Sequence, residues 1–234
     1  MSHDDYDFEP IPGLPALPPE GESILWQGSP DWRTLARRVF RLHWIAAYFA
    51  ALLVYRAAGA GPTPAEVAAA LAPALLLSAA ACAILLLLSR AIARTTIYTI
   101  TNRRVVMRFG VALPVTYNLP FASIAAVGLN RRMTGDGDIT IKLTGGQRIA
   151  YLVLWPHARP GRLAAPEPML RSLSDVAPVA TVLGDALTAY QRSLAAEASH
   201  EATDGASNTG PGRIAEPRPV RSVRFPHRRL AAAE

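Results

Sequence analysis

The sequence of 234 residues contains a single cysteine, Cys82, and a single lysine, Lys142. One thiol cannot form an internal disulfide, and it cannot provide a cysteine-based zinc site. Charged residues make up only 18% of the chain, whereas about a quarter is usual in soluble domains. The composition therefore excludes a disulfide scaffold, argues against a soluble enzyme built around a metal cluster, and indicates a concentrated hydrophobic region.

That region is centred on Val67–Leu88, a run of 22 residues without a charge. A helix of this length extends for about 33 Å, which is enough to cross a hydrocarbon layer of about 30 Å. Pro73 lies inside the run, and membrane helices tolerate proline better than soluble helices do. The alternative is a buried helix of a large soluble core. The pattern favours a membrane span over about residues 66–89.

A second apolar segment lies upstream, at about residues 40–60. Its uncharged part, Leu42–Tyr55, has only 14 residues and could lie in the membrane interface if it stood alone. Arg41 and Arg56 bracket it, and long arginine side chains can extend outward from the ends of a span. A Gly- and Pro-rich turn at 59–64 follows. We therefore expect a two-helix transmembrane hairpin within residues 32–94.

Arginines cluster at the two chain ends of this hairpin, which lie on the same side of the membrane. They are Arg33, Arg37, Arg38 and Arg41 before the first helix and Arg90, Arg94, Arg103 and Arg104 after the second. The positive-inside rule then predicts a multi-pass protein of the bacterial inner membrane with both termini in the cytoplasm. Residues 1–31 contain seven acidic and no basic residues, which is unlike the start of a signal peptide. The first 20 residues, which are acidic and Pro-rich, are expected to be extended and mobile, and residues 21–28 are expected to form one short strand.

After Arg94 the pattern becomes typical of strands. Six short apolar or alternating segments are expected to form an antiparallel sandwich or barrel, at residues 95–100, 104–109, 114–119, 123–129, 139–143 and 148–155. An irregular link at 156–168 leads to an amphipathic helix with apolar residues at spacings of three and four from Val176 to Leu194. Residues 196–234 are expected to form a disordered basic tail.

Few residues are candidates for a site. His43 in the first apolar segment could ligate a pigment or metal, although a lone histidine there is more often an interfacial residue. The basic pairs Arg103–Arg104 and Arg131–Arg132 could contact anionic lipid or a partner, or could be solvated turns. No acid, base and nucleophile share a spacing that catalysis requires, so we expect no enzyme activity. Residues 135–138 are read as a hairpin turn in preference to a calcium loop.

One motif resembles a known domain. The stretch around Thr95–Val111 is similar to the bacterial pleckstrin-homology (PH) domain, in which a Y-x-[IL]-T-[ND]-x-R-[VI] pattern is common; it is matched here by Tyr98, Ile100, Thr101, Asn102, Arg104 and Val105. This resemblance implies a PH-like domain at about residues 95–195. The predicted fold class is thus a membrane α-helical hairpin plus an α+β domain, in which a PH-like antiparallel sandwich or barrel is capped by a C-terminal amphipathic helix.

The chain as a whole resembles a narrower family. The segments PIPGLP, ESILWQGSPDWRTLARRVF, LWPHARP and PEPML occur in the order found in a photosynthetic complex assembly protein of purple bacteria, encoded with the reaction-centre H subunit. The resemblance implies an assembly factor of the intracytoplasmic photosynthetic membrane, acting on reaction-centre and core light-harvesting subunits, without a cofactor or catalytic residues. Membrane lipid and further copies of the chain are additional candidate partners, whereas the distribution of arginine argues against nucleic acid.

Overall fold

The computed structural model describes residues 11–144 and 150–207, and its strands form two antiparallel sheets. The first sheet has the order β1-β2-β3-β4, with strands Ile24–Gly28, Ile97–Thr101, Arg104–Phe109 and Val115–Pro120. The second has the order β5-β6-β7, with strands Ile124–Arg131, Gly137–Leu143 and Met169–Leu173. A short 3-10 turn, η1 (Phe121–Ser123), connects the sheets. The PH-like antiparallel architecture expected from the sequence is therefore present.

The core lies between the two sheets because alternate residues of each strand turn inward. In the first sheet Tyr98 pairs with Met107 and Ile100 with Val105, and all four are fully buried. Helix α5 (Val176–Ser207) packs its predicted apolar stripe into this core through Val176, Val179 and Leu183, while Leu187 and Tyr190 are partly buried and Leu194 is exposed. The amphipathic helix thus covers the domain as its periodicity predicted.

Helix α5 is longer than expected, since it continues to Ser207. The chain divides into two compact units, residues 1–194 and 195–234, so the helix passes from one unit into the other. The expected disordered tail at 196–234 therefore overlaps a helical segment up to Ser207. The remainder of that prediction lies outside the described residues.

The described residues form four further α-helices: α1 (Trp32–Arg38), α2 (Leu42–Ala58), α3 (Pro64–Thr95) and α4 (Tyr151–Leu154). Helix α3 begins with a capping box in which Thr63 and Glu66 satisfy each other's backbone N–H groups, and Pro64 occupies the first turn. It runs through Pro73 without ending. Only Thr96, which is buried, separates α3 from β2.

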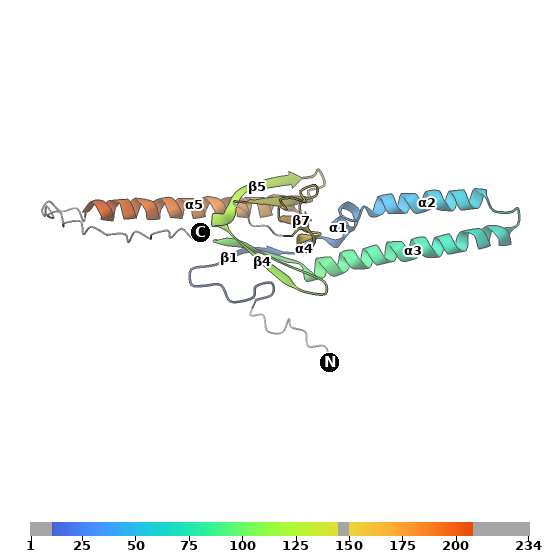
Figure 1. Ribbon diagram of the computed structural model, residues 1–234, viewed down its shortest axis with the longest axis horizontal. Helices are drawn as coiled ribbons and strands as arrows, with labels where there is room; N and C mark the ends of the chain where they lie inside the picture. Colours follow the sequence, from blue (N-terminus) through green and yellow to red (C-terminus); the bar gives the residue numbers. More distant parts are fainter. Residues whose placement is uncertain (1–10, 145–149, 208–234) are drawn as a thin grey trace, which may run out of the picture. The chain divides into compact units, whose positions relative to one another are not determined.

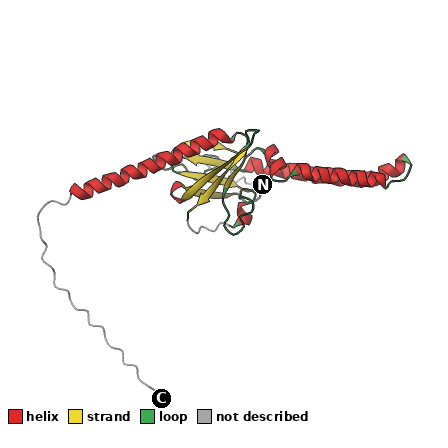
Figure 2. Cartoon of the chain, turned by 90° about the horizontal axis from the view of Figure 1, so that it is seen from above, coloured by secondary structure: helices red, strands yellow, loops and turns green. Residues whose placement is uncertain are grey.

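Helices α2 and α3 lie side by side in Figure 1 and Figure 2, and Arg56 Nε of α2 donates to the Ala70 carbonyl of α3 at 3.3 Å. By length and composition α3 could cross a membrane, whereas α2 is apolar but shorter, with 17 residues. Within the described residues, one helix thus meets the requirement for a span, where the sequence pattern predicted two.

The N-terminal segment is packed where mobility was expected. Leu14 is only 2% exposed, and Gln27 of β1 donates through Nε2 to the Pro12 carbonyl at 2.7 Å. A Cβ atom on Gly13 would lie 2.6 Å from the Ile97 side chain, so the segment approaches β2 closely. Residues 11–22 therefore cover the outer face of the first sheet, and residues 1–10 lie outside the described residues.

Two segments between β6 and α5 differ from the sequence interpretation. The strand expected at 148–155 is wrong in its second half, because Tyr151–Leu154 forms the short helix α4; residues 148 and 149 lie outside the described part. Conversely, Met169–Leu173 forms β7 beside β6, where no strand was expected. Its five residues directly follow Pro168, and a proline at this point argued against a strand. The strand forms because it pairs with β6, which is distant in the sequence.

Candidate functional site

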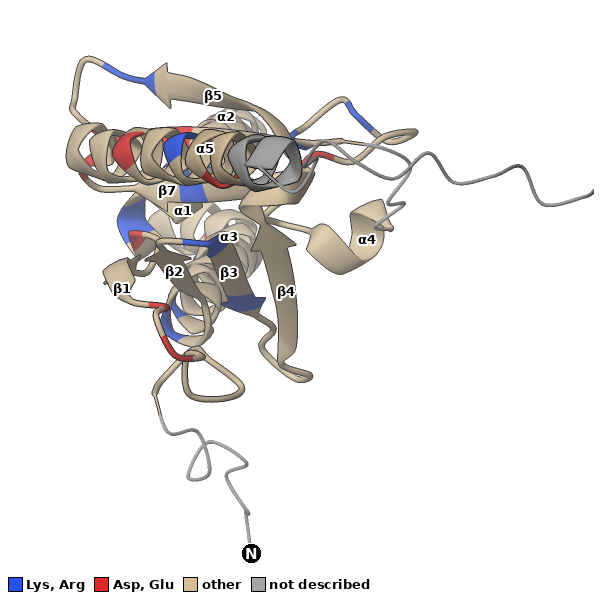
Figure 3. Ribbon diagram, turned by 90° about the vertical axis from the view of Figure 1, so that its left-hand side faces the viewer, with Lys and Arg blue, Asp and Glu red and all other residues tan. Residues whose placement is uncertain are grey.

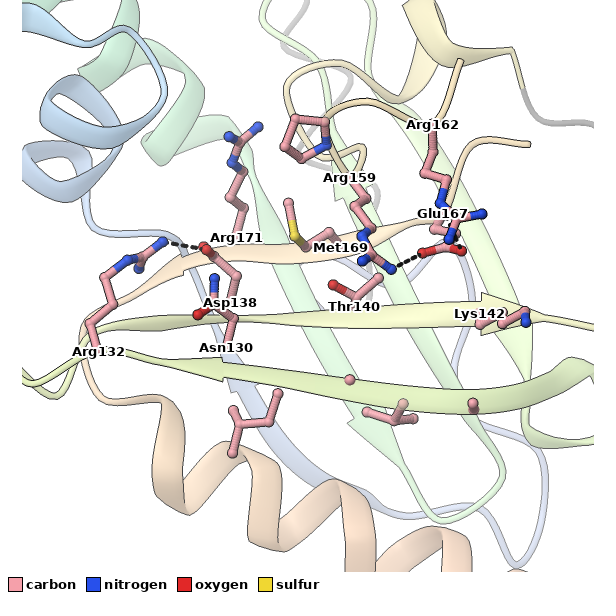
Figure 4. A pocket seen from close by; sticks show the side chains of 15 residues that line it. Asn130, Arg132, Asp138, Thr140, Lys142, Arg159, Arg162, Glu167, Met169 and Arg171 are labelled. Carbon is pink, nitrogen blue, oxygen red and sulfur yellow. Dashed lines mark hydrogen bonds and ion pairs between the residues drawn. The ribbon is translucent and has the colours of Figure 1, made fainter. Parts of the chain in front are cut away.

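The outer face of the second sheet forms a groove of about 640 Å³. Its floor follows from the antiparallel register: Gly128 pairs with Thr140 and Ala126 with Lys142, so these residues face away from the core, opposite Ile139 and Ile141. The loop before β7 forms the wall. Figure 4 labels the side chains around it: Asn130, Arg132, Asp138, Thr140, Lys142, Arg159, Arg162, Glu167, Met169 and Arg171.

The groove carries an excess of positive charge, with five basic residues and two carboxylates among its lining residues. Asp138 is paired with Arg132, and Glu167 accepts from Arg159 Nη1 at 2.8 Å and lies 3.9 Å from Arg162. Among the described residues Lys142 has no ion-pair partner. Each carboxylate is therefore already neutralised, and the remaining positive charge favours an anionic ligand.

The wall of the groove is held to the sheet by backbone hydrogen bonds. The Arg159 N–H donates to the Glu167 carbonyl at 2.9 Å, and the Met169 N–H donates to the His157 carbonyl at 2.8 Å. Arg171 Nη1 donates to the Pro156 carbonyl at 2.8 Å. These bonds fix the loop, so the groove is formed before any ligand is bound.

His157 anchors the same loop from inside the core. It is fully buried, its Nδ1 lies 2.6 Å from Tyr98 Oη, and its Nε2 lies 3.2 Å from Thr96 Oγ1. Burial, reinforced by the charge of Arg171, lowers the pKa of His157 to about 3. The imidazole is therefore neutral near pH 7, with one nitrogen available to donate and the other to accept.

The hydrogen-bond network continues from His157 to the groove. The Arg171 backbone N–H donates to Tyr98 Oη at 3.2 Å, and burial raises the pKa of this phenol. Burial also lowers the pKa of the Arg171 guanidinium. Both shifts follow from desolvation of the charged form. Arg171 thus joins the buried polar network of the core to the cationic lining of the groove.

The two predicted basic pairs lie at opposite ends of the domain. The Phe121 N–H donates to the Arg103 carbonyl, so the start of β5 lies near the first pair. The eight residues of β5 then carry the chain for about 23 Å to Arg131. Figure 3 shows basic positions at the arrowhead of β5, away from the β2–β3 turn. The four arginines therefore do not form one surface.

Each pair contains one residue that is engaged in the fold. Arg104 binds Glu22 through two hydrogen bonds of 2.7 and 2.8 Å. Burial raises the pKa of Glu22, but the hydrogen bonds from Arg104 and Thr101 and the charges of Arg104 and Arg103 together outweigh burial and leave the pKa below its ordinary value. Arg132 is held by Asp136 and Asp138. Only Arg103 and Arg131 are exposed.

The PH motif itself has a structural role here. Thr101 Oγ1 accepts from the backbone N–H groups of Arg103 and Arg104 at 3.2 and 3.0 Å, closing the β2–β3 turn. Asn102 Oδ1 accepts from the Ser23 N–H, and Asn102 Nδ2 donates to the Gly21 carbonyl. The motif thus holds the N-terminal segment against the first sheet.

His43 is exposed in the first turn of α2 and lines a polar hollow of about 320 Å³. The hollow lies between α1 and the β5–β6 turn, and Arg37, Arg38 and Asp136 also line it. Residues 132–136 form the β5–β6 turn, closed by a bond from the Arg132 N–H to the Asp136 carbonyl at 2.9 Å. The turn expected at 135–138 is therefore right for its first two residues and wrong for Gly137 and Asp138, which lie in β6. No cluster of three metal-ligating side chains occurs within residues 11–144 and 150–207.

Sequence reasoning found one part of the groove and missed the rest. The alternation at 139–143 predicted a polar face containing Thr140 and Lys142, and this face is the floor. The contributions of Arg159 and Arg162 to the groove were missed because residues 156–168 read as an irregular link. That of Arg171 was missed because no strand was expected at Met169–Leu173. From the sequence, His157 with Arg159 could form a polar anchor after Trp155 and Pro156, but it gave no metal site. The partners of His157 in the structure, Thr96 and Tyr98, lie about 60 residues away in the sequence.

Comparisons with known proteins show which proteins this chain is similar to. The bacterial PH domain family matches residues 43–186, which is more than half of the chain and includes α3 and strands β2 to β7. An uncharacterized 23.7 kDa protein in the puhA 5′ region of Rhodobacter capsulatus is 41% identical over 194 residues, covering 81% of this chain and 90% of that protein.

Among solved structures, a DUF1696 family protein with a pleckstrin-homology domain from Shewanella loihica PV-4 is 13% identical, with a TM-score of 0.26 over 38% of this chain and 69% of the other. The family match and the Rhodobacter relative both cover most of the chain that carries the two sheets and the groove. The chain belongs to the bacterial PH domain family.

Proposed function

We propose that this chain is an integral-membrane assembly factor for the photosynthetic reaction centre and its core light-harvesting complex, without catalytic activity of its own. The observation that carries the proposal is the Rhodobacter capsulatus relative, which is 41% identical and is described by its position next to puhA, a reaction-centre gene. The apolar α3 and the attached PH-like domain suit a factor that meets membrane subunits at the cytoplasmic surface.

In the proposed topology α2 and α3 cross the inner membrane as a hairpin and both termini are cytoplasmic. Helix α2 has 17 residues and extends for about 26 Å, slightly less than a hydrocarbon layer. Arg41 and Arg56 at its ends can reach the interfaces with their long side chains. The flanking arginines of α1 and of the α3 C-terminus then lie on the cytoplasmic side.

The groove supplies the contact with a partner in this proposal. Its lining carries an excess of cations: Lys142 and Arg171 lie on strands, Arg159 and Arg162 lie on the loop before β7, and Arg132 lies on the β5–β6 turn beside α1. Such a groove suits an acidic ligand, and in this proposal the ligand is a cytoplasmic segment of a reaction-centre or antenna subunit in the same membrane. The role assigned to the groove is electrostatic complementarity, which gives specificity and rate of encounter.

A gene deletion in the native bacterium tests the role. The absorption bands of assembled reaction centre and core antenna are expected to fall, while bacteriochlorophyll synthesis continues. Restoring the wild-type gene should restore both complexes. Normal amounts of both complexes in the deletion strain would show that the chain is not an assembly factor for them.

Two groove variants test the contact. The double variant Lys142→Glu with Arg162→Glu reverses two charges of the groove and should lower complex assembly without lowering the amount of the factor. The control Arg192→Glu, on the exposed surface of α5, should leave complex assembly unchanged. Gly128→Leu should obstruct the floor sterically. Its matched control is Gly128→Ala, because a Cβ atom there would meet only Thr140 Cβ at an ordinary 3.9 Å. Full assembly with both groove variants would exclude the groove as the contact.

A second candidate function is a membrane-anchored PH-like domain that binds anionic lipid or scaffolds other membrane proteins. It is favoured by Arg131, which is exposed at the end of β5 that borders the α1 hollow. Added anionic lipid should then raise the thermal unfolding midpoint of the detergent-purified chain more than zwitterionic lipid does. The difference should disappear when Arg103, Arg104, Arg131 and Arg132 are replaced by glutamine; its persistence would exclude these residues.

A further inference from the structure

Five large apolar side chains stand exposed on two neighbouring segments of the domain. They belong to the β3–β4 loop and to α4 with the residue after it: Val111, Leu113, Leu152, Val153 and Trp155, here called the apolar rim. Leu113 is 79% exposed and Leu152 is 86% exposed. Contiguous exposed apolar surface of this kind usually marks a place of contact.

The apolar rim adjoins the end of α3 that leads into the domain. A hollow of about 180 Å³ is shared by Val111, Leu113, Val153 and Trp155 with Leu88 and Ile92 of α3. Leu88 is the last apolar residue before Ser89 and Arg90, where the uncharged run of α3 ends. The apolar rim therefore adjoins the C-terminal end of the apolar surface of α3 and extends that surface onto the domain.

The rim also borders the other helix of the hairpin. The ring of Trp155 packs edge-on against Phe40, at 5.9 Å between centroids, and Phe40 lies two residues before α2. Tryptophan prefers the boundary between lipid and water, because its ring is apolar and its N–H is polar. Arg90 and Arg94, exposed on the last turns of α3, provide cations at the same level.

The β3–β4 loop is built to present its apolar residues outward. Gly110 has a φ of +130°, and a Cβ atom at this position would come within 2.0 Å of the Leu113 carbonyl. Only glycine permits so tight a turn. The loop therefore keeps Leu113 away from the core, even though Phe109, one residue before Gly110, is buried in it.

We propose that the apolar rim inserts into the interfacial layer of the cytoplasmic leaflet and so docks the PH-like domain on the bilayer. The inference rests on the proposed membrane topology, in which α3 is a span. Continuity with Leu88 and Ile92, the position of Trp155 between the two helices, and the adjacent arginines all favour lipid as the occupant. The bilayer then covers surface that the domain itself leaves open.

Nitroxide labels on single cysteines of the full chain, reconstituted in lipid bilayers, test this inference. Cys82, the native cysteine within α3, reports on the span in the wild-type chain. In a Cys82→Ser background, Leu113→Cys and Leu152→Cys report on the rim. Leu194→Cys, exposed on α5 about 27 Å along the helix from its start, is the matched control. The measurement compares collisions with oxygen, which partitions into lipid, and with a water-soluble nickel complex.

Labels at 113 and 152 are expected to favour oxygen, and the label at 194 is expected to favour the nickel complex. If the label on Cys82 favours oxygen while 113 and 152 match 194, the span stands and the docking of the rim is wrong. If Cys82 also favours the nickel complex, the membrane topology fails first. Labels at 113 and 152 that become shielded only in native membranes would show that a protein covers the rim, which also overturns the proposal.

Discussion

The two sheets of this domain differ in what covers their outer faces. The outer face of the first sheet is closed by residues 11–22 of the same chain, so that Thr99, Thr101 and Val106 are buried on the side away from the core. The outer face of the second sheet is the open groove, and its edge strand β5 is exposed along almost its whole length.

The closed sheet shows how this fold holds an extended segment. An acidic residue, Glu22, is bound by Arg104 at the start of β3, and Leu14 of the same segment is buried. The groove offers comparable elements, with arginines along its wall and small or polar residues on its floor, but no segment within the described residues fills it. The comparison teaches that the chain itself covers the outer face of one sheet and leaves the outer face of the other open.

Removing the packed residue of the closed sheet should have the largest effect. Leu14→Ala is expected to lower the free energy of unfolding by about 2–5 kcal/mol, because it empties a buried site. Leu17→Ala, in the same segment but 64% exposed, is the control and should change little. Chemical denaturation of the detergent-purified chain measures both. Equal, small effects would contradict the packing of residues 11–22 on the first sheet.

The ion pair of the closed sheet should come next. Arg104→Gln is expected to cost about 1–3 kcal/mol, because it leaves the Glu22 carboxylate, whose side chain is 3% exposed, without its partner. The pKa of Glu22 is held below 4.5 in the fold. This stabilisation is therefore present above pH 4.5, and it is lost as the pH falls through the folded pKa.

The difference between wild type and Arg104→Gln should thus shrink in acid, which denaturation at pH 7 and pH 3.5 measures. Arg103→Gln, at the neighbouring exposed arginine, is the control and should leave stability within about 0.5 kcal/mol of wild type. If the stability difference between wild type and Arg104→Gln did not change with pH, Arg104 would stabilise the fold by some interaction other than its ion pair with Glu22.

The histidine that anchors the groove wall should make stability depend on pH. The unfolded chain binds a proton at His157 below its ordinary pKa of 6.5, whereas the folded chain binds it only near pH 3. Stability is therefore expected to fall as the pH drops from 6.5 towards 3, by at most about 1.4 kcal/mol per pH unit. His157→Gln should flatten this slope between pH 7 and 5, and the exposed control His43→Gln should not. An unchanged slope in His157→Gln would assign the dependence to other groups.

The open sheet should show the smallest effect on stability. Lys142→Gln and Arg159→Gln are each expected to change the free energy of unfolding by less than about 1 kcal/mol, because Lys142 is exposed and the Arg159–Glu167 pair is partly exposed. Thermal unfolding midpoints close to that of wild type would sharpen the contrast with Arg104→Gln. A loss as large as that of Arg104→Gln would mean that the groove residues also serve the fold.

Local patterns predicted much of the fold. The β2–β3 hairpin followed from two segments rich in β-branched and apolar residues, at 95–100 and 104–109, and α3 followed from its uncharged run. The apolar run ending at Leu154 was read as a strand because its side chains are those of a core strand. Two of its residues, Leu152 and Val153, instead lie in the exposed rim, a setting that the run alone does not reveal.

The site was less predictable, because its parts meet only through tertiary contacts. The wall of the groove depends on bonds from residues 156–159 to residues 167–171, and β7 exists only by pairing with β6. The arginine pairs were visible in the sequence, but their partners Glu22 and Asp138 were not. Charge could be counted from the sequence, whereas the free charge that remains after pairing required the structure.

The junction of α3 and β2 consists of Thr96 alone, and a single residue extends the chain by about 3.8 Å. In the proposed topology the domain consequently has almost no reach above the bilayer. Its search for a partner becomes two-dimensional, within one thin layer, and the effective concentration of any subunit segment in that layer is high. In this topology the domain cannot reach a segment that lies further from the membrane surface. The short junction would therefore limit which partner segments can bind, independently of the side chains that line the groove.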